Sequence, residues 1–423
     1  MAVLRIESGV DSGISYFIEE RATLGRDPKQ ATIHIRDHKA SRVHAKIIRQ
    51  KGEYFLKDCN SKNGTLLNGK PVKKTVKLEP GDYIGIGYTW AYFGEKLEIE
   101  TINRQLSTYK ILQEIKDTSS AGHSYKANQV DLVRTVTLNL LPPNIIRNNP
   151  QLKNCFHQQA MALAKLNHEN ISIILDFEEK EAYLYFTTEY LEGESLATFI
   201  RDKKEISIEK TLEIGIAIAR ALAHAHEKKV IHQDVSPLNV VICGRRIILR
   251  GFGVSAVLSE VKDNFQGLIG RIEYLSPEQI SKQQITYKTD IYSLGVLLYE
   301  LLTTVTPFVG DNPDITTEII LNDPPKSITS YNSFVTAEIE NIIYQCLEKD
   351  PKDRPENCEE IADKLEEILL RRKVLKLKDI PNVTSFALLH YLNQILEKPL
   401  FVWIFFPFFS FILLIFIKFL ITD

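Results

Sequence analysis

The stretch IHQDVSPLNVVI at residues 231–242 decides the fold of the largest part of this 423-residue chain. It sets Asp234 and Asn239 five residues apart, just after KTLEIGIAIARALAHAHEKK at 210–229, whose apolar spacing predicts a long helix. The segments upstream of this helix are short and strand-like, so we expect strands first and helices later. Four more blocks follow downstream: GFGV at 251–254, YLSPEQ at 274–279, TDIYSLGVLLYELLT at 289–303 and CLEKDPKDRP at 346–355.

In this order and spacing, the blocks resemble a bacterial (Hanks-type) serine/threonine protein kinase domain over residues 109–372. The resemblance implies a two-lobed α+β fold that transfers a phosphoryl group from ATP with the help of Mg²⁺. Asp234 stands at the position of the catalytic base, and Asn239 stands at the position of a metal ligand. The family's structural anchors are matched by Glu278, Asp290 and Arg354.

Other positions depart from the kinase pattern. Asn139, in VTLNLL at 136–141, replaces the lysine that grips the phosphates, and Gln159 replaces the glutamate partner of that lysine. Gly251 replaces the metal-binding aspartate before Phe252. Losing one group that stabilises a transition state typically costs ~10²–10³ in rate. The sequence therefore predicts a pseudokinase that is catalytically impaired or inactive. It is compatible with ATP binding, but Mg²⁺ binding is doubtful because the main metal-binding carboxylate is missing at Gly251.

Several alternatives stay open for this domain. Asp234 could serve a slow kinase as the base, with Asn239 as the sole metal ligand, or both residues could persist only for the hydrogen bonds of their loop. Lys126, on the strand next to Asn139, could replace the missing lysine. The domain could also sense ATP without transferring phosphate. We further expect Asn139 and Gln159 to form an amide pair in place of the usual ion pair.

The first hundred residues have a different pattern, in which short strand-like runs alternate with turns. The runs follow one another at intervals of about ten residues, with Asn-Gly turns between some of them, and this pattern predicts an all-β sandwich. The runs are TIHI at 32–35, HAKIIR at 44–49, EYFLKD at 53–58 and DYIGIG at 82–87. A phosphothreonine brings about −1.5 to −2 charges and three acceptor oxygens, so cations and donors on the loops between such strands would suit it.

The turns carry Gly25-Arg26, Ser41-Arg42 with His44, SKNGT at 61–65 and Asn68-Gly69. These elements lie at the spacings of a forkhead-associated (FHA) domain, which residues 1–98 closely resemble. The resemblance implies that the domain binds proteins containing phosphothreonine. The implied roles are phosphate contacts for Arg26, Ser41 and Lys62, a nearby cation at Arg42, support of the loop or the peptide backbone by Asn63, a bond to the peptide main chain from Asn68, and a structural brace at His44.

The activation segment of the kinase-like domain, Val254 to Leu275, contains no threonine, and Gln233 replaces the arginine that receives an activating phosphate. Only Ser255 and Ser259 could be modified there. We therefore expect the FHA domain to read another protein.

Composition excludes several other classes of protein. The formal net charge of −2, from 52 basic and 54 acidic residues, does not favour nucleic-acid binding. The five cysteines show no metal-ligand spacing, and the start MAVLRIESG does not resemble a secretory signal. A short polar linker is expected at 99–108.

The segment LFVWIFFPFFSFILLIFI at 400–417 has no charged residue. Extended to Ile421, it can span the ~30 Å hydrocarbon core of a membrane, so we predict a transmembrane helix at 400–421 rather than a buried core helix. Basic residues precede the span, which places residues 1–399 in the cytoplasm. Within the juxtamembrane segment 373–398, TSFALLHYLNQIL suits an amphipathic helix, although a solvated spacer would serve as well.

Together these features predict a single-pass signalling protein of the cell membrane. Its FHA domain would bind a phosphothreonine partner, while its kinase-like domain would scaffold or control a second protein. The alternative is an active or weakly active ATP-dependent serine/threonine protein kinase.

Overall fold

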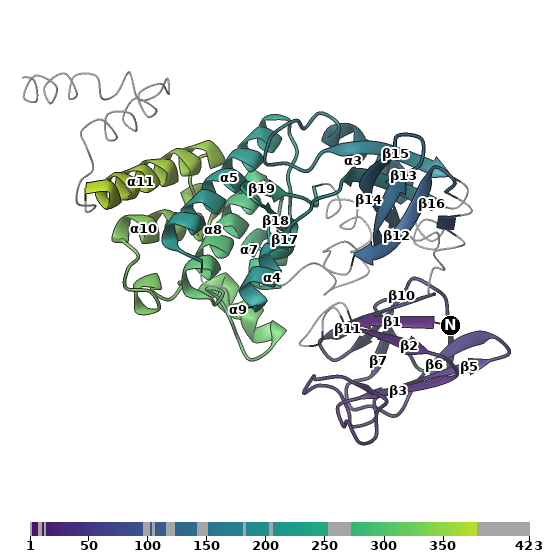
Figure 1. Cartoon of the computed structure of the whole chain (residues 1–423). Helices are drawn as coiled ribbons and strands as arrows, with labels where there is room; N and C mark the ends of the chain where they lie inside the picture. Colours follow the sequence, from purple (N-terminus) through teal and green to yellow (C-terminus); the bar gives the residue numbers. More distant parts are fainter. Residues whose placement is uncertain are drawn as a thin grey trace, which may run out of the picture. The chain divides into compact units, whose positions relative to one another are not determined.

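The computed structural model describes residues 2–6, 11, 14–95, 102–103, 106–115, 123–141, 151–180, 183–202, 206–252 and 272–378 (Figure 1). Within these residues no helix is both long enough and apolar enough to cross a membrane. The predicted span at 400–421 and the predicted amphipathic helix at 384–396 lie outside the described residues.

The first domain is a sandwich of two sheets, as predicted. One sheet has the strand order β2 (Ser15–Ile18), β1 (Ala2–Ile6), β11 (Thr89–Glu95), β10 (Asp82–Ile86), β7 (Thr65–Leu67) and β8 (Lys70–Pro71). The other has the order β4 (Ile33–His34), β3 (Arg21–Gly25), β5 (Ala45–Gln50), β6 (Glu53–Asp58) and β9 (Val76–Leu78). The four strand-like runs identified in the sequence thus form β4, β5, β6 and β10.

Alternation of apolar and polar residues builds this sandwich. Inward side chains of both sheets form one core that includes Leu4, Leu24, Ile47, Leu56, Ile84 and Phe93. Two-residue turns join neighbouring strands at Lys51-Gly52 and Asn68-Gly69, and all four residues have positive φ angles between 50° and 87°. Such turns match the twist of paired strands, which explains why an Asn-Gly pair was a reliable signal.

The second, kinase-like domain begins with a small lobe that consists of one antiparallel sheet and one long helix. The sheet order is β12 (Tyr109–Ile115), β13 (His123–Gln129), β14 (Arg134–Leu141), β16 (Tyr183–Glu189) and β15 (Ile174–Lys180). Helix α3 (Gln151–Leu163) lies against this sheet, with the Phe156 ring centroid 4.7 Å from that of Phe177 on β15.

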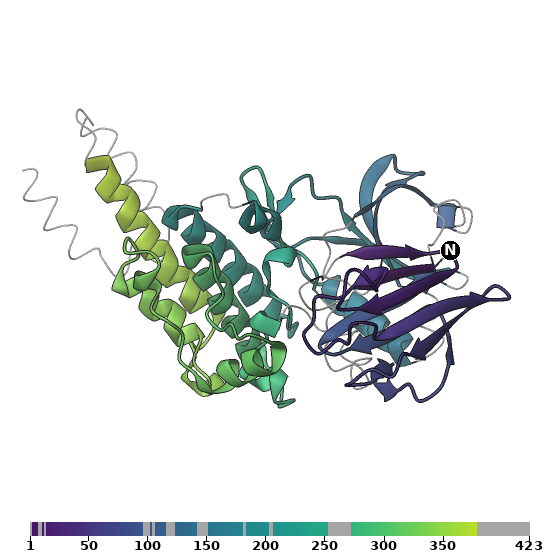
Figure 2. The ribbon, with the colours of Figure 1, turned by 90° about the horizontal axis from the view of Figure 1, so that it is seen from below.

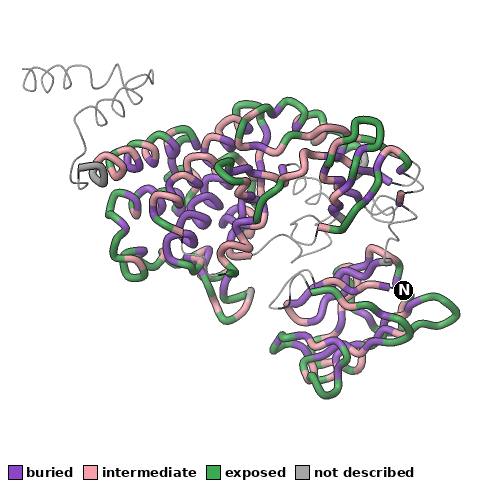
Figure 3. The backbone as a smooth tube through the Cα atoms, in the orientation of Figure 1, coloured by how far each residue is buried: buried purple, intermediate pink, exposed green. Residues whose placement is uncertain are grey.

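The large lobe is mainly helical, and its helices gather into one bundle (Figure 2). Helix α8 runs through the buried centre of this bundle (Figure 3). Side-chain caps start α5 at Ser207 and α8 at Thr286, where each side-chain oxygen accepts a hydrogen bond from a backbone amide, as capping residues do. The helices are α4 (Leu196–Arg201), α5 (Ile208–Glu227), α7 (Pro277–Ile280), α8 (Tyr287–Thr303), α9 (Pro313–Asn322), α10 (Ala337–Cys346) and α11 (Cys358–Lys378).

Short elements complete the large lobe. A small sheet has the order β17 (Glu194–Ser195), β18 (Val240–Cys243) and β19 (Arg246–Leu249). The 3-10 turns are η1 (Pro237–Asn239), η2 (Ile272–Tyr274), η3 (Ile328–Ser330) and η4 (Pro351–Asp353).

One helix boundary differs slightly from that predicted. The helix expected at 210–229 is α5, which starts at Ile208 because its capping residue is Ser207, and ends at Glu227. The last described helix, α11, continues to Lys378, and the domain end predicted at residue 372 stays a prediction.

Candidate functional site

The loop residues predicted to bind phosphate meet at one end of a single sheet. Strand β3 ends at Gly25, β5 starts opposite it at Ala45, and β6 ends opposite the start of β5 at Asp58. Three loops therefore leave the sheet at the same end. They carry Arg26, Ser41, Arg42, Lys62 and Asn63, all exposed or half-buried.

Hydrogen bonds tie these three loops together. The Arg26 amide donates to the Ser41 carbonyl at 2.9 Å, and the Lys62 amide donates to the Ser41 hydroxyl at 3.0 Å. A hydroxyl that accepts from an amide keeps its own O–H as a donor, which suits a phosphate oxygen. The Asn63 side-chain amide donates to the Lys39 carbonyl at 2.7 Å, so this residue holds the loop, one of its two predicted roles.

His44 braces the loops from inside the domain, as predicted. Its ring is fully buried, its Nδ1 accepts from the Ser41 amide at 3.0 Å, and its Nε2 lies 3.1 Å from the Gly64 carbonyl. Burial lowers the pKa of His44, which favours the neutral ring that can accept at one nitrogen and donate at the other.

Asp58 is a site residue that the sequence analysis missed. Its carboxylate accepts hydrogen bonds from the Ser61 amide at 3.0 Å, the Ser61 hydroxyl at 2.6 Å and the Thr65 hydroxyl at 2.5 Å. Burial by itself raises the pKa of Asp58, but these bonds outweigh it and leave the pKa lowered. The ionised carboxylate thus shapes the loop that presents Lys62. Its position at the end of a strand, before a Ser-Lys-Asn-Gly turn, was the available signal.

Asn68 makes two side-chain hydrogen bonds within its own domain. Its side-chain amide donates to Asp82 at 2.7 Å, and its side-chain oxygen accepts from the Tyr83 amide at 2.8 Å. These two bonds hold the side chain in the turn between β7 and β8. An amide group carries a second N–H and a second lone pair, so the contact with a peptide main chain stays a prediction.

The kinase domain contains a cavity of about 440 Å³ between its small-lobe sheet and its catalytic loop. Its lining includes Thr137 and Asn139 from β14, Tyr190 after β16, and Asn239 and Gly251 from the large lobe. The cavity therefore brings together three positions that the sequence analysis singled out.

Asn139 is half-buried and accepts a hydrogen bond from the Ser124 hydroxyl at 2.8 Å. An amide and a hydroxyl thus stand where the family carries an ammonium group. Gln159 lies on α3, but its side chain is outside the described part of the structure, so the predicted amide pair with Asn139 stays a prediction. The Lys126 ammonium lies 4.2 Å from the ring centroid of Tyr190, which lines the cavity, in a cation–π contact. Lys126 as a replacement lysine stays a prediction.

Asp234 and Asn239 are hydrogen-bonded to each other. The Asn239 side-chain amide donates to the Asp234 carboxylate at 2.9 Å and to the Asp234 carbonyl at 2.7 Å. Gly251 has a φ angle of +90°, and a Cβ there would lie 2.7 Å from the Asn239 side-chain oxygen. Since L-residues rarely adopt such a φ and the space is already filled, an aspartate does not fit at residue 251 without rearrangement.

This donor set does not suit Mg²⁺, which prefers an octahedral shell built on carboxylates, phosphates and water. Asn239 brings an amide oxygen, and residue 251 brings no side chain. Within the described residues, no group of three or more histidine, cysteine, aspartate or glutamate side chains could hold a metal ion.

Arg250 is a second cleft residue that the sequence analysis missed. It lines the cavity, and its guanidinium donates to the Leu238 carbonyl at 3.0 Å. A cation therefore lies on the large-lobe side of the cleft, next to Gly251, although the small-lobe lysine is absent. The signal available in the sequence was a basic residue directly before the GFGV motif at 251–254.

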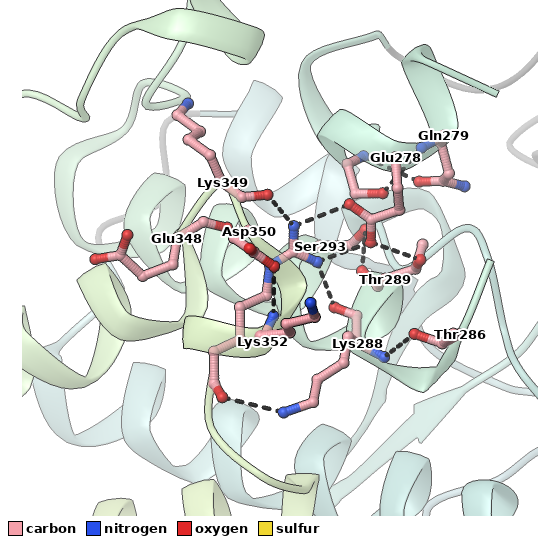
Figure 4. A network of polar contacts seen from close by, with 12 residues as sticks. Glu278, Gln279, Thr286, Lys288, Thr289, Ser293, Glu348, Lys349, Asp350 and Lys352 are labelled. Atoms are coloured by element: carbon pink, nitrogen blue, oxygen red, sulfur yellow. Dashed lines mark hydrogen bonds and ion pairs between the residues drawn. The ribbon is translucent and has the colours of Figure 1, made fainter. Parts of the chain in front are cut away.

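The predicted anchors hold the large lobe together. Asp290 accepts from the backbone amides of His232 and Gln233, both at 2.8 Å, and so positions the catalytic loop. Figure 4 shows the second anchor, where Glu278 accepts from Thr289 at 2.8 Å and also pairs with Arg354. These contacts keep the kinase fold independently of the groups lost from the cleft.

Comparison with protein families agrees with both domains. A protein kinase domain model matches residues 120–365, and an FHA domain model matches residues 22–87. A probable serine/threonine-protein kinase of Clostridium perfringens is 32% identical over 281 residues, which is 65% of this chain and 39% of that protein. The serine/threonine-protein kinase PrkC of Bacillus subtilis is 32% identical over 255 residues, 60% of this chain and 39% of that protein. The chain thus spans about two fifths of the length of these relatives.

Two solved structures share the fold. The PknI kinase domain of Mycobacterium tuberculosis has a TM-score of 0.50 and 21% identity, covering 62% of this chain and 95% of that chain. Rad53 in complex with AMP-PNP has a TM-score of 0.52 and 21% identity, covering 87% of this chain and 99% of that chain. With a family model that covers more than half of its length, the chain belongs to the protein kinase family, with a serine/threonine-type kinase domain that follows an FHA domain.

Proposed function

We propose that this chain is a signalling pseudokinase. Its FHA domain captures a phosphothreonine protein, and its kinase domain positions or regulates a second protein without useful phosphoryl transfer. The observation that carries the proposal is the backbone at Gly251, whose φ of +90° is rare for L-residues and where an added Cβ would lie 2.7 Å from the Asn239 side-chain oxygen.

The charge balance of the cleft supports the same proposal. ATP needs cations near its phosphates, yet Asn139 and Ser124 place neutral groups at the lysine position. Lost transition-state contacts within one catalytic unit do not add simply, but each typically costs about 10²–10³ in rate. Arg250 and Arg201 are cations of the large-lobe side that line the cavity and could still attract a phosphate.

Phosphotransfer measurements on the full chain test this half of the proposal. We expect the wild type to incorporate no more phosphate from ATP than Asp234→Asn does, with or without Mg²⁺. An Asn139→Lys variant should bind ATP about 10-fold more tightly, because hydrogen bonds to charged groups are worth about 1.5–3 kcal/mol. It should still show no Mg²⁺-dependent phosphotransfer. Asn128→Lys, on an exposed position of β13, is the matched control.

One observation favours a weakly active kinase as the second candidate. The Asp234 carboxylate accepts a hydrogen bond from the Asn239 side-chain amide at 2.9 Å, and Asp290 fixes the same loop by accepting a hydrogen bond from the Gln233 backbone amide. If phosphate incorporation by the wild type disappears in Asp234→Asn, this second candidate replaces the first.

The FHA half of the proposal rests on Arg26, Ser41 and Lys62 at one end of the sheet, two of them joined through the Ser41 hydroxyl. Arg26→Ala should lower the affinity of the full chain for a phosphothreonine peptide by about 10- to 100-fold, since bonds to charged groups are the strong ones. Fluorescence anisotropy with a labelled peptide measures this, and the unphosphorylated peptide is the control. Unchanged affinity in Arg26→Ala would remove phosphothreonine binding from the proposal.

We also propose that residues 400–421 anchor the chain in the cell membrane, with residues 1–399 on the cytoplasmic side. The charge-free run at 400–417 supports this proposal. Tethering would raise the effective concentration of the two bound partners for each other. Alkaline carbonate extraction of membranes should leave the full chain in the pellet, and deletion of 400–421 should release it.

A further inference from the structure

One face of the FHA sandwich carries more positive charge than its fold requires. The face consists of the outward side chains of β3, β5, β6 and β9, which lie side by side in the second sheet (Figure 1). Alternation along each strand sends these side chains outward and their neighbours into the core. We call it the basic sheet face, and it comprises Arg21, Thr23, Lys46, Ile48, Gln50, Glu53, Phe55, Lys57 and Lys77, in which Glu53 is the one carboxylate.

Strand pairing arranges most of this face in two rows. In the row nearer the phosphate-binding loops, Lys46 stands between Thr23 and Lys57. In the next row, Ile48 and Phe55 stand side by side, flanked by Arg21 on one side and Lys77 on the other. The two rows are two residues apart along each strand, or about 7 Å at the usual rise.

Lys46 and Lys57 are directly opposite each other in an antiparallel pair. Side chains in such pairs have Cβ atoms about 4.5–5.5 Å apart, and like charges there destabilise the sheet. Lysines often protect the edges of sheets, which accounts for Lys77 on the edge strand β9. Strands β5 and β6 are interior strands of this sheet, so edge protection does not account for Lys46 and Lys57.

Neighbouring carboxylates do not neutralise the first row. Among the residues that the structure describes, Lys77 pairs with Glu53 at 2.8 Å and with Glu79 at 2.9 Å. Within that same set, no ion pair involves Arg21, Lys46 or Lys57. Three exposed cations therefore lie next to a half-buried apolar pair, Ile48 and Phe55: Lys46 and Lys57 in the adjacent row and Arg21 at one flank.

The first row is continuous with the candidate phosphate site. Lys46 is the second residue of β5, which follows the loop of Ser41 and His44. Lys57 immediately precedes Asp58, whose carboxylate holds Ser61 in the loop of Lys62. A peptide whose phosphate lies between these loops can therefore extend directly onto the basic sheet face.

We propose that the basic sheet face binds acidic residues that flank the phosphothreonine of the partner, with an apolar side chain of the partner on Ile48 and Phe55. This inference rests on the proposed phosphothreonine binding and adds a requirement for the partner's sequence. Charge complementarity identifies the occupant, because Lys46 and Lys57 in the first row and Arg21 in the second, about 7 Å apart along the strands, match carboxylates two residues apart in an extended peptide. The apolar pair in the second row favours a peptide over a nucleic-acid backbone.

The test compares two phosphothreonine peptides that share one core sequence, measured by fluorescence anisotropy with the full chain. One carries aspartate and glutamate on both sides of the core, and the other carries asparagine and glutamine at the same positions. We expect the acidic peptide to bind about 3- to 10-fold more tightly than the neutral peptide, because a few exposed ion pairs contribute an affinity gain of this size. The difference in affinity should shrink as the salt concentration rises, because salt screens exposed charges.

The double variant Lys46→Gln, Lys57→Gln should abolish this advantage and leave the affinity for the neutral peptide unchanged. It removes a like-charge pair, so its thermal unfolding midpoint should not fall. The matched control is Lys70→Gln, Lys73→Gln, which removes two exposed lysines at and after β8 of the other sheet and should keep the advantage.

The outcomes separate this inference from the proposed function. Equal binding of the two peptides, with loss of both in Arg26→Ala, would overturn the inference and keep phosphothreonine binding. Failure of both phosphopeptides to bind would overturn the proposed function itself. Equal loss of both peptides in the double variant, or displacement of the acidic peptide by a single-stranded oligonucleotide, would also overturn the inference.

Discussion

Arg354 and Glu278 form an ion pair at 2.8 Å in which both side chains are almost completely buried, with exposed fractions of 0% and 2%. The Arg354 guanidinium also donates to the carbonyls of Lys288, Glu348 and Lys349. Burial by itself raises the pKa of Glu278, but Arg354 outweighs it and leaves the pKa lowered, so the carboxylate stays charged. The pair joins the start of α7 to the loop before α11.

Arg354→Ala should therefore destabilise the kinase domain strongly. Removing one partner of a buried ion pair leaves an uncompensated charge and costs about 3–5 kcal/mol. Lys364→Ala is the matched control, because Lys364 pairs with Glu360 at a similar distance, 2.7 Å, in an exposed place. Such exposed pairs are worth about 0–1 kcal/mol. Urea unfolding of the two variants measures the difference, and equal midpoints would contradict the structural role of Arg354.

Replacement of Gly251 should cost more than strain alone. Gly251 and Gly244 both have positive φ, +90° and +61°, but a Cβ at Gly244 meets nothing within 4 Å. Gly244→Ala should cost about 1 kcal/mol in unfolding free energy, as expected for strain alone. Gly251→Ala should cost roughly 1–3 kcal/mol more, because it also overlaps Asn239 and overpacks the loop. Equal costs in the two variants would mean that Asn239 moves aside freely.

Asn68→Ala should lower the stability of the FHA domain. It removes two hydrogen bonds, to Asp82 and Tyr83, and leaves a residue with a φ of 51° that alanine rarely adopts. The expected cost is about 1–3 kcal/mol in unfolding free energy. Affinity for a phosphothreonine peptide, measured where the protein is fully folded, tests the peptide contact separately and should fall about 5-fold, as expected for one lost hydrogen bond. Unchanged affinity would contradict the peptide contact that the resemblance implies.

Acid should weaken the FHA domain through His44. Burial lowers the pKa of His44 below its ordinary value of 6.5. Below pH 6.5 the unfolded chain therefore binds a proton that the folded domain resists, so stability is full above this value and falls as the pH drops through it. Protonation would also place a donor at Nδ1 opposite the Ser41 amide, which is itself a donor.

Thermal unfolding of the full chain as a function of pH measures this effect. His44→Gln should flatten the acid side of the stability profile, whereas His38→Gln, at an exposed loop position, should not. Unfolding is a better readout than peptide binding here, because the phosphate of the peptide itself titrates near pH 6, about its second pKa. A His44→Gln profile parallel to that of the wild type would contradict the assignment.

Much of this protein was determined by local sequence. The strands β5 and β6 follow from period-two alternation, and the hairpin at Asn68-Gly69 follows from residues that accept positive φ. The kinase domain was evident because Asp234, Asn239, Glu278, Asp290 and Arg354 belong to short motifs in a fixed order. The chemical losses at Asn139 and Gly251 could also be read directly, since each is a single substitution within such a motif.

The tertiary structure alone decided what fills those positions and which side chains meet. The Ser124 hydroxyl engages Asn139 because β13 pairs with β14, and the Lys126 ammonium reaches Tyr190 because the chain returns there after β16. Asn68 bonds inward because β10 lies beside β7, and Lys46 opposes Lys57 only through the register of β5 and β6. Local pattern sets the face to which a side chain points, whereas its partner depends on strand order and register, which are long-range properties of the packed chain.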